Sequence, residues 1–117
     1  MPQCELANAI TALVIQWHQN YLGKNLVEVK TDIIRDMIIV SFKVEIPPIE
    51  SHLLKEKEGV ILVKNVCQQL IEYDRESLDE ILFNVTGSRM VSLHTDVSTK
   101  TGERILVFKM GRSLEQI

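Results

Sequence analysis

The sequence predicts an α+β fold, a two-layer sandwich in the element order α-β-β-α-β-β, in which a four-stranded antiparallel sheet carries the helices on one face. Two long stretches have apolar residues at helical spacing, and each is followed by two short segments in which apolar and polar residues alternate. The chain has 117 residues, 45% of them hydrophobic. This length and composition suit a single domain over 1–117, with an ordered core over about 5–110.

The first predicted element is an amphipathic helix over residues 3–22. Its large apolar residues recur every three or four positions and form a broad stripe along one face: Leu6, Ile10, Leu13, Val14, Trp17 and Tyr21. Gly23 follows directly and is a natural C-terminal stop. We expect His18 to face solvent.

The next predicted element is a β-hairpin. Residues 26–31 and 37–46 alternate between apolar and polar side chains, as half-buried strands do. The stretch 32–36, which is polar at both ends, is the expected turn. The Pro47–Pro48 pair ends the second strand, because proline has no N–H to donate to the sheet ladder.

Two helices are expected before the second hairpin. A short one covers 49–57, and Gly59 breaks or bends the chain before a long helix over 60–85. The long helix would run roughly 40 Å at 1.5 Å per residue. Its middle, 72–76, is charged, which indicates a segment that projects or packs against a partner. Gly87 is the expected stop.

The second hairpin completes the sheet. Residues 89–97 alternate, 98–103 form a loop, and 104–110 are the last strand. The tail over 111–117 is expected to fray.

One face of this sheet is left without helices. Alternation places six apolar residues beneath the helices: Val27, Val29, Val40, Phe42, Leu93 and Phe108. The opposite face then exposes Met37, Ile39, Ile105 and Val107. An exposed apolar patch of this kind marks a partner surface, so we predict a homodimer through these four residues or through the long helix. The alternative is that these are ordinary scattered surface residues.

A weak ligand-binding set lies on the same open face. His94 and Asp96 are two residues apart on one strand, so their side chains project from the same side. A carboxylate can orient an imidazole, and Ser92 and Lys43 join the pair on that face. An isolated pair lacks the third group of a catalytic site, so a solvated polar pair is the favoured interpretation and no catalytic residue is assigned.

The two turns that follow helices carry cations. Lys24 follows Gly23, and Arg89 stands two residues after Gly87. Neither turn is a phosphate-binding loop, because both glycines follow a helix rather than precede one. Lys24 and Arg89 would bind an anion if the two turns lay close together.

Metal, cofactor and nucleic-acid chemistry have little support. Cys4 and Cys67 lack the spacing of a zinc site, and Cys67 is expected to be a small core residue. No metal or cofactor is expected. The net charge is -3 and aromatic residues make up 5%, which weighs against a nucleic-acid partner. No targeting sequence or membrane span is visible, so we expect a cytoplasmic location.

Several segments together resemble the MpsC-like family, which is named for a sodium-translocating, membrane-potential-generating system. The resemblance covers roughly 5–110 and rests on the order and spacing of these segments: Ala7-Asn8-Ala9, Tyr21-Leu22-Gly23-Lys24, Asp36-Met37-Ile38-Ile39-Val40, Val85-Thr86-Gly87-Ser88-Arg89, Leu93-His94-Thr95-Asp96-Val97 and Arg104-Ile105-Leu106-Val107-Phe108. It implies an accessory or regulatory subunit of a membrane cation or inorganic-carbon transport system.

By motif position, the resemblance assigns family-typical roles to Gly23, Lys24, Gly87, Arg89 and Asp96. The sequence departs from the family at two of these places. The family continues its first glycine turn with Arg-Gly-Pro, whereas this chain has Lys24-Asn25-Leu26. His94-Thr95-Asp96 replaces a more typical Leu-Ser-Asp. The first departure weighs against anion binding at that turn.

Three functions follow from these observations. The leading one is a non-enzymatic cytoplasmic module that self-associates and binds a partner, with a membrane transport system as the implied partner. The second is a regulatory domain that binds a small molecule on the open sheet face. The third is a small hydrolase or thioesterase-like enzyme that uses His94 and Asp96.

Overall fold

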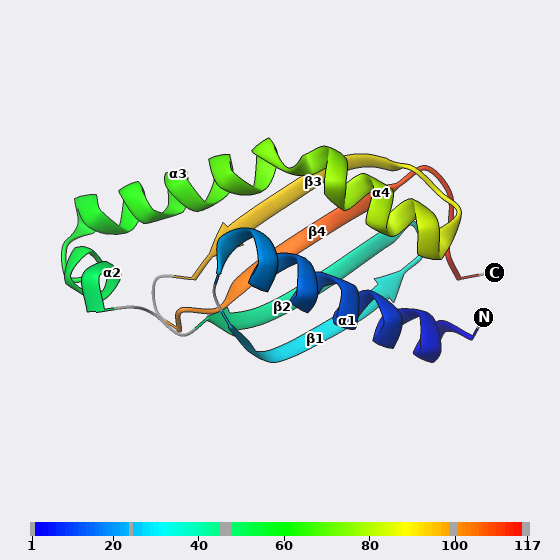
Figure 1. The fold of residues 1–117 in the computed structure, drawn as a ribbon, viewed down its shortest axis with the longest axis horizontal. Coiled ribbons are helices and arrows are strands. Elements are labelled where there is room, and N and C mark those ends of the chain that lie inside the picture. Colours follow the sequence, from blue (N-terminus) through cyan, green and yellow to red (C-terminus); the bar gives the residue numbers. More distant parts are fainter. Residues whose placement is uncertain (1, 24, 45–47, 99–100, 116–117) are drawn as a thin grey trace.

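The computed structural model describes residues 2–23, 25–44, 48–98 and 101–115, and it forms two layers (Figure 1). One layer is a four-stranded antiparallel sheet, and helices lie on one face of it. The elements in chain order are α1 (Gln3–Leu22), β1 (Leu26–Ile34), β2 (Met37–Val44), α2 (Pro48–Leu53), α3 (Lys57–Tyr73), α4 (Arg75–Thr86), β3 (Met90–Val97) and β4 (Arg104–Met110). The predicted α+β sandwich and its element order are confirmed.

The sheet has the strand order β1-β2-β4-β3, so the two hairpins meet through their second strands. In the β2–β4 pairing, Ile38 lies opposite Phe108 and Val40 lies opposite Leu106. Both central strands alternate strictly between buried and half-buried residues, apart from the exposed Lys109 on β4. The predicted end of β2 at 45–46 lies outside the described residues.

The core fills the space between the helices and the inner face of the sheet. Burying apolar area at about 25 cal/mol per Å² is the main favourable contribution to folding a domain of this size. The largest fully buried apolar side chains come from α1, α4, both central strands and the tail: Leu6, Ile10, Ile38, Phe42, Leu78, Leu82, Leu106, Phe108, Met110 and Leu114.

His18 is buried, and the expectation that it faces solvent is wrong. Only 1% of the residue is exposed, and its ring packs edge-on against Phe42 with the centroids 5.5 Å apart. Position 18 is four residues past Val14, so it belongs to the buried stripe of α1.

The predicted long helix is two helices that break at Asp74. The Asp74 backbone leaves the helical region, at φ -105° and ψ 20°. Its Oδ2 accepts a 2.7 Å hydrogen bond from Nε1 of Trp17, and its Oδ1 accepts one of 3.0 Å from the Ser77 hydroxyl. The break lets α4 lie over the sheet beside α1, while α3 continues past the end of the sheet (Figure 1).

Gly59 does not separate the helices, because it lies inside the first turns of α3. The short helix α2 ends earlier than predicted, at Leu53, and folds back against α3. A Cβ at position 59 would lie 1.9 Å from the Leu53 carbonyl oxygen. Glycine therefore permits the close approach of α2 to α3.

The edge strand β1 contains a bulge that moves Val27 to the open face. The register shifts between Val27 and Lys30, and Glu28 has a φ of 53°. Val27 pairs with Lys43 and is 41% exposed, so its predicted position beneath the helices is wrong. Val29 is partly buried against the core, as predicted.

The C-terminal tail is docked through residue 115, in contrast to the predicted fraying. Leu114 is fully buried, and its N–H donates a 2.8 Å hydrogen bond to the Arg35 carbonyl. The Arg35 N–H in turn donates to Oε1 of Glu115 at 2.7 Å. The tail therefore packs on the β1–β2 turn.

Candidate functional site

The open face of the sheet carries an apolar block in its centre, formed by Met37, Ile39, Ile105 and Val107. The strand register places Ile39 opposite Val107. Met37 lies two residues from Ile39 on β2, and Ile105 lies two residues from Val107 on β4, so both share the same face of the sheet. All four side chains are half-buried, and the helices lie on the other side of the sheet. The structure therefore brings together the four residues that the sequence assigns to an interface.

Ion pairs frame this block on two sides. The Lys43 ammonium lies 3.3 Å from a carboxylate oxygen of Glu28, and the Lys109 ammonium lies 2.6 Å from one of Asp36. The hydrogen bond from Lys109 lowers the pKa of Asp36 below its ordinary value of 3.8. The apolar block thus has a charged rim, the usual arrangement of a protein interface.

The Ser92, His94 and Asp96 set is only partly assembled. Nε2 of His94 lies 3.2 Å from the Ser92 hydroxyl, within reach for proton transfer. The Asp96 carboxylate instead accepts from the Val97 N–H at 2.8 Å and from the Lys64 ammonium at 3.2 Å. The hydrogen bond from the Val97 N–H, and after it the one from Lys64, lowers the pKa of Asp96. This carboxylate is therefore ionised, and it faces Lys64.

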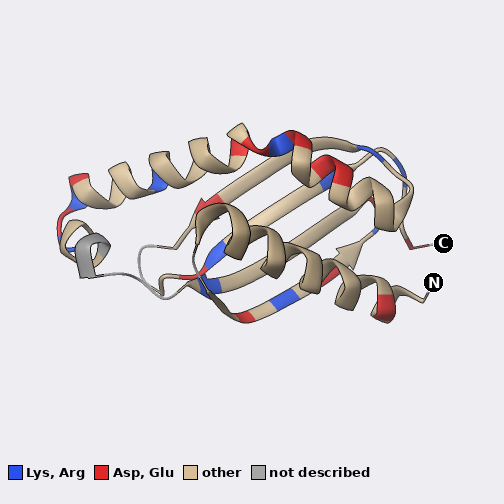
Figure 2. Cartoon of the chain, viewed as in Figure 1, with Lys and Arg blue, Asp and Glu red and all other residues tan. Residues whose placement is uncertain are grey.

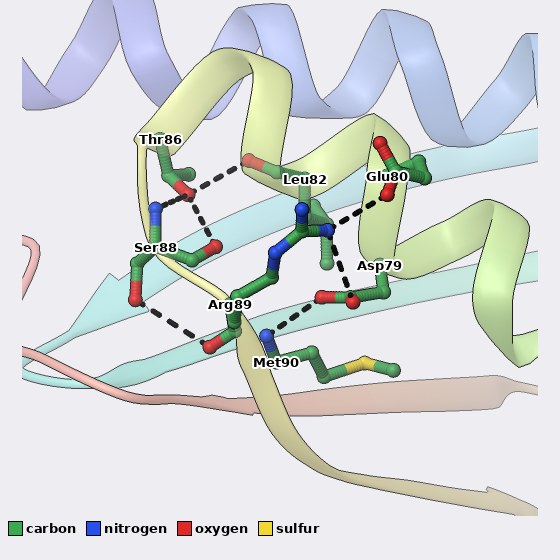
Figure 3. A network of polar contacts seen from close by, with 7 residues as sticks. All are labelled: Asp79, Glu80, Leu82, Thr86, Ser88, Arg89 and Met90. Carbon is green, nitrogen blue, oxygen red and sulfur yellow. Dashed lines mark hydrogen bonds and ion pairs between the residues drawn. The ribbon is translucent and has the colours of Figure 1, made fainter.

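Arg89 is bound by side chains of the preceding helix, α4 (Figure 3). Its guanidinium bonds Glu80 at 2.8 Å and Asp79 at 3.3 Å, and it lies 3.9 Å over the Phe83 ring. The hydrogen bond to Glu80 raises the pKa of Arg89. Asp79 also accepts from the Met90 N–H at 2.8 Å, so this network fixes the exit from α4 into β3.

The two helix-exit turns do not form a shared anion site. The turn at Gly23 leads into β1 at Leu26, which pairs with the far end of β2 at Val44. The turn at Gly87 leads into β3 where Met90 pairs with Met110, at the opposite end of the sheet (Figure 1). Lys24 lies outside the described residues.

Arg104 is a buried cation that the sequence analysis did not single out. It is 7% exposed, and it lies on the helix-covered side of β4 together with Leu106 and Phe108. Its guanidinium donates to Sγ of Cys67 at 3.4 Å, so Cys67 is half-buried beside a charge rather than enclosed in the apolar core. The alternation of β4 was the available signal, since position 104 shares the parity of the buried residues.

Within the described ranges, no group of three or more His, Cys, Asp or Glu side chains gathers where it could hold a metal ion. The acidic residues of the charged segment 72–76 and of the helix after it lie along the end of α3 and on α4, as Figure 2 shows. Asp74 and Asp79 are used there as hydrogen-bond acceptors.

The fold and the open face define a small α+β module with helices on one side of a four-stranded sheet and an apolar block on the other. The chain belongs to the MpsC family, since residues 3–112 match the family model described as "Na+-translocating membrane potential-generating system (MpsC)". The resemblance inferred from the sequence is thereby confirmed.

A relative in Bacillus subtilis (strain 168), described as "Uncharacterized protein YbcI", is 41% identical over 111 residues, which cover 95% of this chain and 90% of that protein. No solved structure matches the chain. In the described part of the chain, none of the helices combines the length and apolar character needed to cross a membrane.

Proposed function

We propose that this chain is a non-enzymatic cytoplasmic module that forms a homodimer through the open face of its sheet. In this proposal the module serves as an accessory or regulatory subunit of a membrane transport system for cations or inorganic carbon. The observation that carries the proposal is the apolar block of Met37, Ile39, Ile105 and Val107 at the centre of that face. Contiguous apolar side chains on an open surface with a polar rim are typical of interaction sites, and the four side chains of this block are each half-buried on such a surface.

The charges around the block favour a second copy of the chain as its occupant. Lys30 and Asp32 lie two residues apart on the open side of β1, where they pair with Ser41 and Ile39 of β2. Neither has an ion pair among the described residues. A two-fold axis that lies in the plane of the interface, perpendicular to β1 and level with Thr31, would bring Lys30 of one copy to Asp32 of the other.

The proposed partner follows from the family. The family is described as a sodium-translocating system, and the described helices of this chain do not reach the length and apolarity of a membrane span. A chain of this kind contributes to such a system by contact with its membrane-embedded subunits rather than by conducting ions itself.

A hydrolase is the weaker alternative, although the Ser92–His94 contact gives it one supporting observation. A nucleophile and its base need a third group that orients the base, and the Asp96 carboxylate faces Lys64 instead. The set also lies on an open strand, where water has free access. A small-molecule site at Ser92 and His94 remains the other alternative, without Lys43, which lies toward the opposite end of the open face, where it pairs with Val27.

The dimer is tested by light scattering after size-exclusion chromatography on the wild type, Ile39→Lys and Leu62→Lys. Leu62 is the matched control, because it is an exposed aliphatic residue on α3, the other proposed interface. We expect a dimer for the wild type and Leu62→Lys, and a monomer for Ile39→Lys. A monomeric wild type, or a dimer that only Leu62→Lys disrupts, contradicts the proposal.

The two-fold pairing has its own test. Lys30→Asp and Asp32→Lys should each weaken the dimer, because each places like charges across the axis. The double variant that exchanges the two residues should restore it. If the double variant dimerises no better than either single one, the proposed pairing is wrong.

The membrane partner is tested by affinity capture from detergent-solubilised native membranes. Recovery of a cation or inorganic-carbon transporter supports the proposal, and recovery of the chain alone contradicts it.

The alternative functions are tested by Ser92→Ala and His94→Ala. Dimerisation and capture that persist in both alanine variants remove the support for a site at Ser92 and His94.

A further inference from the structure

A small cavity lies on the covered side of the sheet, between the first half of α3 and the ends of β3 and β4. Its volume is about 60 Å³. Four apolar side chains line it, namely Leu54, Val60, Val63 and Val97, together with the cations Lys64 and Arg104. An apolar cavity with a few converging polar groups is the usual form of a small-molecule site.

Arg104 is the unusual member of this lining. It is 7% exposed, yet no carboxylate of the described residues pairs with it. Among the described residues, the guanidinium makes one side-chain hydrogen bond, to Sγ of Cys67 at 3.4 Å, and a thiol is a weak acceptor. A guanidinium has five N–H donors, and burying such a charge is costly without an anionic partner.

Lys64 adds a second positive charge to the cavity. Its ammonium lies 3.2 Å from Asp96, and its side chain is 35% exposed, so it stands at the edge of the space rather than at its base. Asp96 itself does not line the cavity, and its side chain is 71% exposed. Two cations and no acid therefore border this space among the described residues.

We propose that the cavity binds a small carboxylate with a short apolar chain. The Arg104 guanidinium would take the carboxylate through parallel N–H donors, the geometry in which arginine recognises this group best. Lys64 would add a second charge-assisted hydrogen bond, and the chain would pack against Val60, Val63 and Val97. The apolar majority of the lining favours such a ligand over a bare inorganic anion.

This site is separate from the proposed dimer interface, because the cavity and the apolar block lie on opposite faces of the sheet. Failure of one proposal therefore leaves the other standing. Ligand binding beneath α3 is a means by which the module would respond to a metabolite while its open face stays paired.

The test is a titration of ¹⁵N-labelled protein with acetate, propionate and butyrate at constant ionic strength, followed by amide chemical shifts. We expect shifts at Val63, Lys64 and Arg104. Affinity should rise about fourfold with each added methylene until the cavity is full. Butylammonium and inorganic phosphate are the controls, and neither should produce these shifts. Equal affinity across the three acids, or phosphate binding that matches butyrate, overturns the proposal.

Two variants locate the binding. Lys64→Met removes one cation and should weaken butyrate binding by about tenfold, the effect of one charge-assisted hydrogen bond. Lys57→Met is the matched control, since Lys57 is an exposed lysine of the same helix that does not line the cavity. Arg104→Gln should abolish binding. If the Arg104 variant does not fold, the comparison of Lys64→Met with Lys57→Met still decides, because equal butyrate affinity in these two variants overturns the site.

Discussion

Nε1 of Trp17 donates a 2.7 Å hydrogen bond to Oδ2 of Asp74, and this contact joins α1 to the break between α3 and α4. The other oxygen of the same carboxylate accepts from Ser77 on α4 at 3.0 Å. One side chain therefore ties three helices together at the point where the chain changes direction. We expect Asp74→Ala to reduce the free energy of unfolding by about 2 kcal/mol, because it leaves the buried indole N–H without its charged acceptor.

The measurement is urea unfolding followed by the fluorescence of Trp17, the single tryptophan. Glu76→Ala is the matched control, since Glu76 is an exposed acidic residue in the next turn, and it should change stability by less than about 0.5 kcal/mol. Equal losses in the two variants would show that the Trp17–Asp74 bond contributes little.

The tail makes a second prediction. Leu114 is fully buried. Leu114→Ala should therefore lower the free energy of unfolding by about 3 kcal/mol, because it removes buried apolar surface and leaves a cavity. Ser113→Ala, at an exposed neighbouring position, should have almost no effect. Calorimetric melting of both variants checks this, and a Leu114→Ala protein that melts like the wild type would mean that the tail does not dock in solution.

Local sequence pattern was sufficient for much of the fold. Strict alternation predicts that Ile38, Val40 and Phe42 lie on one face and Ile39 on the other, and the structure confirms it, because central strands have a regular pleat. The same alternation placed the four apolar residues of the open face correctly. These positions depend on neighbours along the chain.

Other features depend on contacts between distant segments. Leu114 is buried because the β1–β2 turn receives it, and Val27 is turned outward by a bulge at Glu28. Asp96 shares a strand with His94, yet it bonds Lys64 of α3, 32 positions away in the chain. No pattern within one segment carries these contacts, so the cavity beneath α3 and the actual partner of Asp96 were not predicted.

The Asp36–Lys109 ion pair predicts a pH dependence. The hydrogen bond from Lys109 lowers the folded pKa of Asp36, so the unfolded chain takes up the proton first as the pH falls. The stabilisation is therefore full above the ordinary value of 3.8 and is lost as the pH falls from there through the lower folded pKa. A double-mutant cycle with Asp36→Asn and Lys109→Met isolates this coupling. We expect coupling at neutral pH that vanishes in acid, and a coupling that is constant with pH would contradict the assignment.

Gly59 provides a prediction in which two physical effects have opposite signs. In a helix interior, replacing glycine with alanine stabilises by about 1 kcal/mol through backbone entropy alone. Here a Cβ would lie 1.9 Å from the Leu53 carbonyl oxygen, so Gly59→Ala must push α2 away from α3. We expect the variant to gain no stability and to lose amide hydrogen-exchange protection in α2. Gly111→Ala is the control, because the nearest atom to its Cβ is the Arg89 carbonyl oxygen at an ordinary 3.5 Å. A more stable Gly59→Ala protein with α2 still protected would mean that the close approach of the two helices is absent in solution.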